Sequence, residues 1–323
     1  MTDLRHEIAR RSAELVSLAD PVDAVALLAV LRLLHGTGRH DLPLGRLFEG
    51  HVDALQIVSR CGSPAQIAVL ADIVAAGAAL GVWNADLPGE PLQLDGLRLT
   101  GGKSFASGAG ILSHALVTVD GDGGRQLILI DLARTPPRVD RDFWRVVGMQ
   151  RSATHIVHWD ANIEAGDLIG APGDYVREPW FSGGALRFAS VQAGGIAALV
   201  DRTRDHLVAT GRAADPHQSG RLAALYGVAE GAAGAIRTAA AGWFGPDQER
   251  LSLVAAARVA VYEAGGRALG LAQEAVGVQA LFVDHPLSAK ITDLSMYLRQ
   301  PGPDAQRMLV GAAVAASILS PAL

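Results

Sequence analysis

Apolar residues recur at helical spacing through the first 80 positions of the chain. Asp20-Pro21 is typical of an N-cap followed by proline at the first helical position, and the apolar run that starts at Val22 ends near Gly36. A second helix is expected over 44–60, and a third follows it. Residues 1–80 are therefore predicted to form an N-terminal helical domain.

The hydrophobic period changes to two after Gly81, which is typical of strands. Asp120 to Gly124 is rich in Asp and Gly and predicts a hairpin turn. The expected strands cover residues 97–100, 115–119, 126–130 and 154–159. Residues 81–178 are predicted to form a small antiparallel β-domain.

Helical spacing returns near Ser182 and continues to the end of the chain. Gly194-Gly195 and Gly265-Gly266 lie inside expected helices, where each Gly costs about 1 kcal/mol relative to Ala, so close contact with neighbouring helices is expected there. The expected helices cover 184–210, 218–243, 248–276, 286–299 and 304–319. The fold class is therefore α+β, with residues 179–323 forming a C-terminal four-helix-type bundle.

Composition narrows the classes of partner. The chain has 323 residues and a net charge of -5, with no cluster of Lys and Arg, which argues against a nucleic-acid surface or a membrane anchor. Cys61 is the only cysteine, and the ten His residues lack metal-ligand spacing, so no metal site is expected. The N-terminus lacks the apolar core of a signal peptide. We expect a cytoplasmic protein with a small-molecule substrate and no nucleic-acid or membrane partner.

A glycine-rich segment, GGKSFAS, begins at Gly101. It resembles the G-x-K-x-W-I-T segment of the acyl-CoA dehydrogenase superfamily, which supplies an aromatic residue and a hydroxyl group near flavin N5. The resemblance places Phe105 at the aromatic position, Ala106 after it and Ser107 at the hydroxyl position. It implies a bound flavin, FAD with FMN as the alternative. Without the resemblance, Phe105 would be a core residue and Ser107 a turn residue.

The segment that precedes it departs from the dehydrogenase pattern. Trp83 and Asn84 stand where dehydrogenases carry a Thr-Glu-Pro loop, and the resemblance implies that both contact the cofactor. Residues 103–109, KSFASGA, match residue by residue the K-x-F-x-S-G-A form of the flavin monooxygenases that share this fold. The alternative for Trp83 is an aromatic residue at a domain interface.

Two segments of the bundle resemble the family's phosphate and adenosine sites. Arg212 lies where a family Arg meets the flavin diphosphate across a subunit boundary, which a guanidinium suits because it grips phosphate oxygens in pairs. Gln273 to Gly277 resembles the start of the Q-x-x-G-G run, although Thr292 stands where Arg is usual. These matches imply a homodimer or homotetramer. The alternative for Arg212 is a surface residue.

The catalytic carboxylate of the dehydrogenases is replaced in this chain. Dehydrogenation needs a base that removes the substrate α-proton while hydride goes to flavin N5. The usual Glu position falls on Gln300, which cannot abstract a proton, and the family's alternative position falls on Leu186. Asp304 and Glu178 are candidates for a relocated base, with a helix cap or a surface carboxylate as the alternative role.

Three functions remain open from the sequence. The first is a flavin-dependent oxidoreductase that transfers hydride from an acyl-thioester-like substrate, such as an acyl-CoA, to flavin N5. The second is a reduced-flavin monooxygenase of the same fold, which needs no such carboxylate because its site mainly excludes water. The third is a homologue that has lost catalysis and keeps a flavin-binding or structural role.

Overall fold

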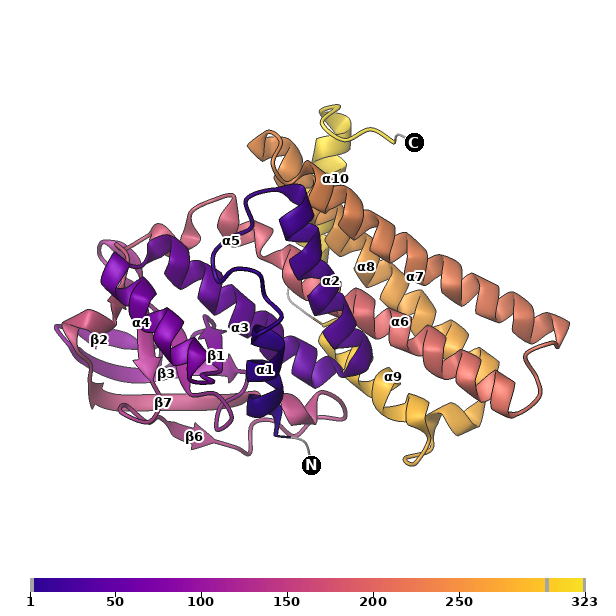
Figure 1. Ribbon diagram of the computed structural model, residues 1–323, viewed down its shortest axis with the longest axis horizontal. Helices are drawn as coiled ribbons and strands as arrows, with labels where there is room; N and C mark the ends of the chain where they lie inside the picture. Colours follow the sequence, from indigo (N-terminus) through magenta and orange to yellow (C-terminus); the bar gives the residue numbers. More distant parts are fainter. Residues whose placement is uncertain (1–2, 300–301, 322–323) are drawn as a thin grey trace. The chain divides into compact units, whose positions relative to one another are not determined.

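The computed structural model describes residues 3–299 and 302–321 (Figure 1). These residues form two compact units. Unit 1 contains the residues up to Pro21, Arg46–Val146 and Gln150–Phe181, and unit 2 contains Val22–Gly45, Val147–Met149 and the chain from Ser182 onwards. The division of the sequence at residues 80 and 178 into three domains stays a prediction.

Unit 1 is built on two four-stranded sheets. The first has the order β1-β4-β5-β8 and the second the order β2-β3-β7-β6. The strands are β1 (Leu80–Trp83), β2 (Gln93–Asp95), β3 (Arg98–Ala106), β4 (His114–Gly121), β5 (Gly124–Asp131), β6 (Arg138–Asp140), β7 (His155–Asn162) and β8 (Leu168–Ile169). The four predicted strands correspond to β3, β4, β5 and β7, and the predicted hairpin joins β4 to β5.

The expectation of a purely antiparallel β-domain is wrong at one edge, because β1 pairs with β4 in parallel. Parallel partners need a crossover connection, and here β2 and β3 lie between the two strands in the chain. The periodic pattern missed β1, β2, β6 and β8, which span only two to four residues each. Strands this short carry no measurable alternation.

Helices cover the first sheet of unit 1. They are α1 (Leu4–Ser12), α3 (Leu42–Cys61) and α4 (Pro64–Ala75). The single turn α5 (Trp180–Gly183) lies where the chain passes from unit 1 to unit 2. Leu55 of α3 and Leu70 of α4 pack in one buried cluster with Leu116 of β4 and Leu127 of β5. This core holds β1 and β4 rigidly, and the segment after β1 leads to the site described below.

Unit 2 is a helical bundle. Its helices are α2 (Ala24–His40), α6 (Ala185–Ala209), α7 (Pro216–Gly242), α8 (Asp247–Val276), α9 (Pro286–Tyr297) and α10 (Pro303–Ala315). Figure 1 shows α6, α7 and α8 side by side, and α10 packs on α8. The sequence predicted these elements closely, since long helices show their periodicity best.

The expected start of α2 is wrong. Asp23, not Asp20, caps the helix, because its Oδ1 atom accepts a hydrogen bond from the N–H group of Ala26 at 2.8 Å. Asp20 instead binds the guanidinium of Arg60, with N–O distances of 2.7 and 3.0 Å. The helix also continues past Gly36 to His40.

Glycines mark close helix contacts at three of the four expected positions. A Cβ atom on Gly194 would lie 2.1 Å from the carbonyl oxygen of His35 in α2, and one on Gly195 would lie 2.5 Å from Leu42. Gly265 similarly faces Leu298. Gly266 has no atom within 4 Å of its Cβ position, so the expectation is wrong there.

Candidate functional site

The end of β3 is irregular where the sequence motif predicts the flavin ring. The register between β3 and β7 shifts between Lys103 and Ala106, as in a β-bulge. Phe105 has φ +52° and Ala153, at the start of the opposing segment, has φ +44°. Left-handed backbone at residues other than Gly costs about 1–3 kcal/mol each and is concentrated at functional sites. The two strained residues lie on paired segments, because Gly108 donates to the carbonyl of Ser152 at 2.8 Å.

The strained backbone leaves the Phe105 side chain 56% exposed. Its ring meets the edge of the Phe143 ring at a centroid distance of 5.1 Å, and Phe143 stacks near Trp144 at 6.4 Å. These aromatic faces suit contact with a planar ring. Phe143 and Trp144 were missed by the sequence analysis, because they lie outside any regular element and match no family segment.

Ser107 is buried at the other end of the motif. Its Oγ atom accepts a hydrogen bond from Thr154 Oγ1 at 3.0 Å, and Thr154 Oγ1 lies 2.8 Å from Ser152 Oγ. The preceding residue, Ala106, is fully buried and fixes the loop in the core. Ser152 and Thr154 were also missed. The strand pattern offered no signal for this pair, because Ser152 ends a 3-10 turn (Gln150–Ser152) and Ala153 has a left-handed backbone.

Trp83 supports this loop from within unit 1. Its indole Nε1 donates to the carbonyl oxygen of Ser107 at 2.8 Å, and its ring lies 6.0 Å from that of Trp159. Its side chain is only 1% exposed. Trp83 therefore supports the Ser107 loop, and its predicted contact with the cofactor stays a prediction.

Asn84 belongs to a polar network around Lys103. The side-chain oxygen of Asn84 accepts from Thr118 Oγ1 at 2.9 Å and from Arg125 Nη1 at 3.0 Å. The ammonium group of Lys103 donates to Asp86 Oδ1 at 2.6 Å, and Lys103 is fully buried. Burial lowers the pKa of Lys103, and the hydrogen bond to Asp86 opposes that effect. The network fastens the segment after β1 to β3.

The phosphate and adenosine candidates meet at one end of the bundle in unit 2. Arg212 is exposed, and its Nη2 atom donates to the side-chain oxygen of Gln218 at 2.5 Å. In this orientation of the amide, the side-chain nitrogen of Gln218 donates to the carbonyl of Ala275 at 3.2 Å. Arg212 is therefore close to the C-terminal end of α8. There, Gln273 donates to Leu269 of its own helix at 3.0 Å, and Gly277 ends the helix with φ +82°.

The segment 147–149 docks on α9 within unit 2. The N–H group of Met149 donates to Asp293 Oδ1 at 2.5 Å. A Cβ atom on Gly148 would lie 2.1 Å from the carbonyl oxygen of Thr292, so only Gly fits this approach. Thr292, which stands where the family has Arg, donates to the carbonyl of Ser288 in its own helix.

The candidates for a catalytic base do not gather in a cavity. Gln300 lies outside the described residues. The Asp304 side chain is 87% exposed and pairs with Arg307 at 2.7 Å in the first turn of α10. Glu178 is also exposed. Asp304 has the surroundings of a surface carboxylate at a helix start, where negative charge stabilises the helix.

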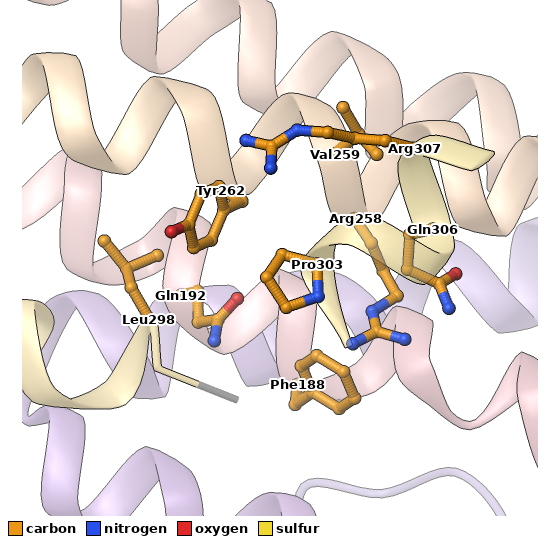
Figure 2. A pocket seen from close by; sticks show the side chains of 9 residues that line it. All are labelled: Phe188, Gln192, Arg258, Val259, Tyr262, Leu298, Pro303, Gln306 and Arg307. Atoms are coloured by element: carbon orange, nitrogen blue, oxygen red, sulfur yellow. The ribbon is translucent and has the colours of Figure 1, made fainter. Parts of the chain in front are cut away.

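A small cavity of about 20 Å³ lies between α6, α8 and α10 (Figure 2). The guanidinium of Arg258 is 4.9 Å from the centre of the Phe188 ring, and burial lowers the pKa of Arg258. The other lining residues are Gln192, Val259, Tyr262, Leu298, Pro303, Gln306 and Arg307. Among the residues that are described, no Asp or Glu lines this cavity.

No group of three His, Cys, Asp or Glu side chains within the described ranges could hold a metal ion. One stretch, Trp180–Ala209, is long and apolar enough to cross a membrane, and 72% of its most apolar window is buried inside the protein. The cytoplasmic location stays a prediction.

Comparison by sequence identifies no relative, since neither a protein-family model nor a curated protein matches the chain. Comparison by structure gives many matches. Dibenzothiophene monooxygenase TdsC from Paenibacillus sp. A11-2 is similar with a TM-score of 0.79 at 17% identity, covering 98% of this chain and 97% of that one. TdsC has also been solved with FMN and indole.

Dehydrogenases are similar to the same degree. Glutaryl-coenzyme A dehydrogenase in complex with glutaryl-CoA has a TM-score of 0.79 at 16% identity, covering 97% of this chain and 86% of that one. Butyryl-CoA dehydrogenase from Megasphaera elsdenii has a TM-score of 0.77 at 16% identity, covering 97% and 89%. The chain therefore has the fold of the acyl-CoA dehydrogenase superfamily, which the monooxygenase shares, and the predicted resemblance and α+β fold class are confirmed.

Proposed function

We propose that this chain is a flavin-dependent oxidoreductase that binds the flavin ring at Phe105, Ala106 and Ser107. The observation that carries the proposal is the bulged end of β3, which exposes the Phe105 ring and buries the Ser107 hydroxyl beside it. An aromatic face next to a hydroxyl donor suits a planar ring with an acceptor nitrogen at its edge. The fold is shared with proteins solved with FMN, which agrees with this assignment.

A flavin bound there would supply two-electron chemistry, and the chain's own residues would hold it. The Phe105 ring would contact the flavin face, and the Ser107 hydroxyl would donate to N5. Trp83 would keep the Ser107 loop in place, and the amide nitrogen of Asn84 would be available as a further donor. FAD is the proposed cofactor and FMN the alternative.

Arg212 is proposed to bind cofactor phosphate together with the end of α8 near Gln273 and Gly277. Arg212 is exposed and lies close to that helix end through Gln218. In the resembling family, such an Arg serves the flavin of a neighbouring subunit, so a homodimer or homotetramer is proposed with it. The substrate is proposed to be a small molecule.

Of the two reactions, oxygenation by reduced flavin is favoured over dehydrogenation of an acyl thioester. Dehydrogenation needs a carboxylate that is desolvated and aimed at the substrate. Asp304 is 87% exposed and paired with Arg307, Glu178 is exposed, and the usual position holds Gln300. Oxygenation needs no such group and relies on excluding water around the flavin. Asp304 and Glu178 are therefore not proposed as bases.

Titration of the purified protein with FAD and with FMN tests the cofactor site. Binding should quench flavin emission and shift its absorption bands. Phe105→Ala should weaken binding roughly tenfold by loss of the aromatic contact. Phe244→Ala is the matched control, since Phe244 is also an exposed aromatic residue but lies in unit 2. Absence of binding to the folded wild type would refute the proposal.

Arg212→Ala should weaken flavin binding by about 1.5–3 kcal/mol, or roughly tenfold to a hundredfold, because a charge-assisted contact is lost. Arg237→Ala provides the control, since Arg237 is an exposed Arg of α7 that pairs with Glu230. Equal affinities for the two variants would show that Arg212 is only a surface residue.

The reaction type is tested anaerobically with butyryl-CoA and glutaryl-CoA. Neither should bleach the bound oxidised flavin, and Gln300→Glu should not create bleaching. Reoxidation of the bound reduced flavin by oxygen should occur in two resolved phases in stopped-flow absorbance. Bleaching of the wild type by an acyl-CoA would favour the dehydrogenase and overturn the preference for oxygenation.

A further inference from the structure

A chain of three hydroxyl groups ends at Ser107. Ser152 Oγ lies 2.8 Å from Thr154 Oγ1, which donates to Ser107 Oγ at 3.0 Å. The three residues are between 1% and 7% exposed, so solvent does not compete for these hydrogen bonds. Residues 107 and 154 are 47 positions apart, and the fold alone brings them together.

The hydrogen bonds between these three hydroxyl groups share one donor direction, from Ser152 through Thr154 to Ser107. Each hydroxyl group carries one proton. Since the single Thr154 hydroxyl proton is used in the hydrogen bond to Ser107, Ser152 must be the donor in the bond to Thr154. Ser107 accepts from Thr154 and keeps its own proton for another acceptor. Successive hydrogen bonds polarise one another, which makes the last hydroxyl a better donor.

Hydrogen bonds of the backbone hold both ends of this series of hydroxyl groups in place. Ala109 donates to the carbonyl of Ala153 at 3.1 Å, next to the bond from Gly108 to Ser152. Trp83 fixes the Ser107 carbonyl from the other side. Threonine suits the central position because its branched side chain is restricted at χ1, so its hydroxyl keeps one direction.

We propose that Thr154 is a positioning residue that, with Ser152 behind it, aims the Ser107 proton at flavin N5. This inference rests on the proposed flavin site. The competing explanation is that the three hydroxyls only satisfy one another inside the fold, as buried polar groups generally do. The two explanations differ in whether Thr154 changes the electronic state of the bound flavin.

The test uses flavin labelled with ¹⁵N at N5, bound to the full chain in its oxidised form. Thr154→Val keeps the shape of the side chain and removes the donor. It should move the N5 resonance in the same direction as Ser107→Ala and weaken binding roughly fivefold. Thr154→Ser should restore the wild-type resonance. Thr37→Val is the control, because Thr37 is a buried Thr of α2 whose hydroxyl donates to Leu33 in its own helix.

The outcomes separate this inference from the flavin site itself. No labelled flavin bound to the wild type would refute the proposed site. A resonance that moves in Ser107→Ala but stays at the wild-type position in Thr154→Val would overturn the role of Thr154 and leave the flavin site intact. If Thr154→Val does not fold, Ser152→Ala removes the donor to Thr154 instead and should give a smaller shift in the same direction. An unchanged N5 resonance in Ser152→Ala would then contradict the proposed role of the three hydroxyl groups.

Discussion

Replacement of Lys103 tests whether the buried network holds the proposed flavin loop. The Lys103 ammonium donates to Asp86 Oδ1 at 2.6 Å, Thr118 Oγ1 at 3.0 Å and the carbonyl of Asn84 at 3.2 Å. Met has a similar volume and no charge. Lys103→Met therefore removes the cation and its three hydrogen bonds while filling the same space.

The expected loss is about 3 kcal/mol in the free energy of unfolding. Removing one partner of a buried ion pair costs about 3–5 kcal/mol, because the other charge stays without compensation. The Asp86 side chain is 31% exposed, so water recovers part of its solvation and the lower end of this range applies. Flavin affinity should fall as well, since the segment after β1 loses its attachment to β3.

The matched control lies on the same strand. Arg98 pairs with Asp160 at 2.7 Å, but their side chains are 62% and 70% exposed. Exposed pairs contribute about 0–1 kcal/mol, so Arg98→Met should change stability little. Urea unfolding followed by tryptophan fluorescence measures both variants, since Trp83 and Trp159 lie in unit 1.

Equal unfolding midpoints for Lys103→Met and Arg98→Met would refute this reasoning. A second variant isolates the cause. In Lys103→Met, Asp86 keeps only the longer contact with Arg125 at 3.9 Å, so adding Asp86→Asn should recover part of the stability lost in the single variant. No recovery would mean that the cost comes from packing and not from the buried charge.

Two further predictions concern packing and pH. Gly194→Ala should destabilise the bundle by about 1–3 kcal/mol, because its Cβ would lie 2.1 Å from the His35 carbonyl oxygen. A Cβ atom on Gly266 would meet no atom within 4 Å, so Gly266→Ala should stabilise the bundle by up to about 1 kcal/mol. Equal thermal midpoints for Gly194→Ala and Gly266→Ala would contradict the close contact of Gly194 with His35. Burial lowers the pKa of His51 from 6.5 to about 4. The unfolded chain therefore binds the proton first, and the free energy of unfolding should fall by about 3 kcal/mol as pH drops from about 6.5 towards 4. In urea titrations across this range, His51→Asn, which keeps an acceptor for the N–H of Leu80, should lose the part of this dependence due to His51, whereas the partly buried His35 and His114 still contribute; an unchanged slope would show that His51 does not titrate in this range.

The periodic parts of the fold were predictable from the sequence. Long helices such as α6 and α8 and the hairpin of β4 and β5 carry their own hydrophobic pattern, which predicts both the element and its buried face. The segment with Phe105 and Ser107 could be picked out by its resemblance to a family segment, and its flavin contact stays a proposal. Local pattern was sufficient for these features.

Features that depend on a distant partner were not predictable. Asp20 and Asp23 both match a helix cap, and the contact of Asp20 with Arg60 decides between them. The short strands exist only through their neighbours, as β1 does beside β4. The alternation of a two- to four-residue strand is too brief to separate it from a loop.

For the same reason, the sequence pointed to Ser107 but not to its partner Thr154. By itself the sequence determined the α+β class, the order of helices and strands, and a hydroxyl at the expected flavin position. Only the tertiary structure decided that Ser107 accepts a hydrogen bond from Thr154, that Trp83 donates to its carbonyl and that Lys103 is buried beside Asp86. Each of these contacts joins residues 17 to 47 positions apart. Folding brings them within hydrogen-bond distance, and no spacing along the chain encodes that approach.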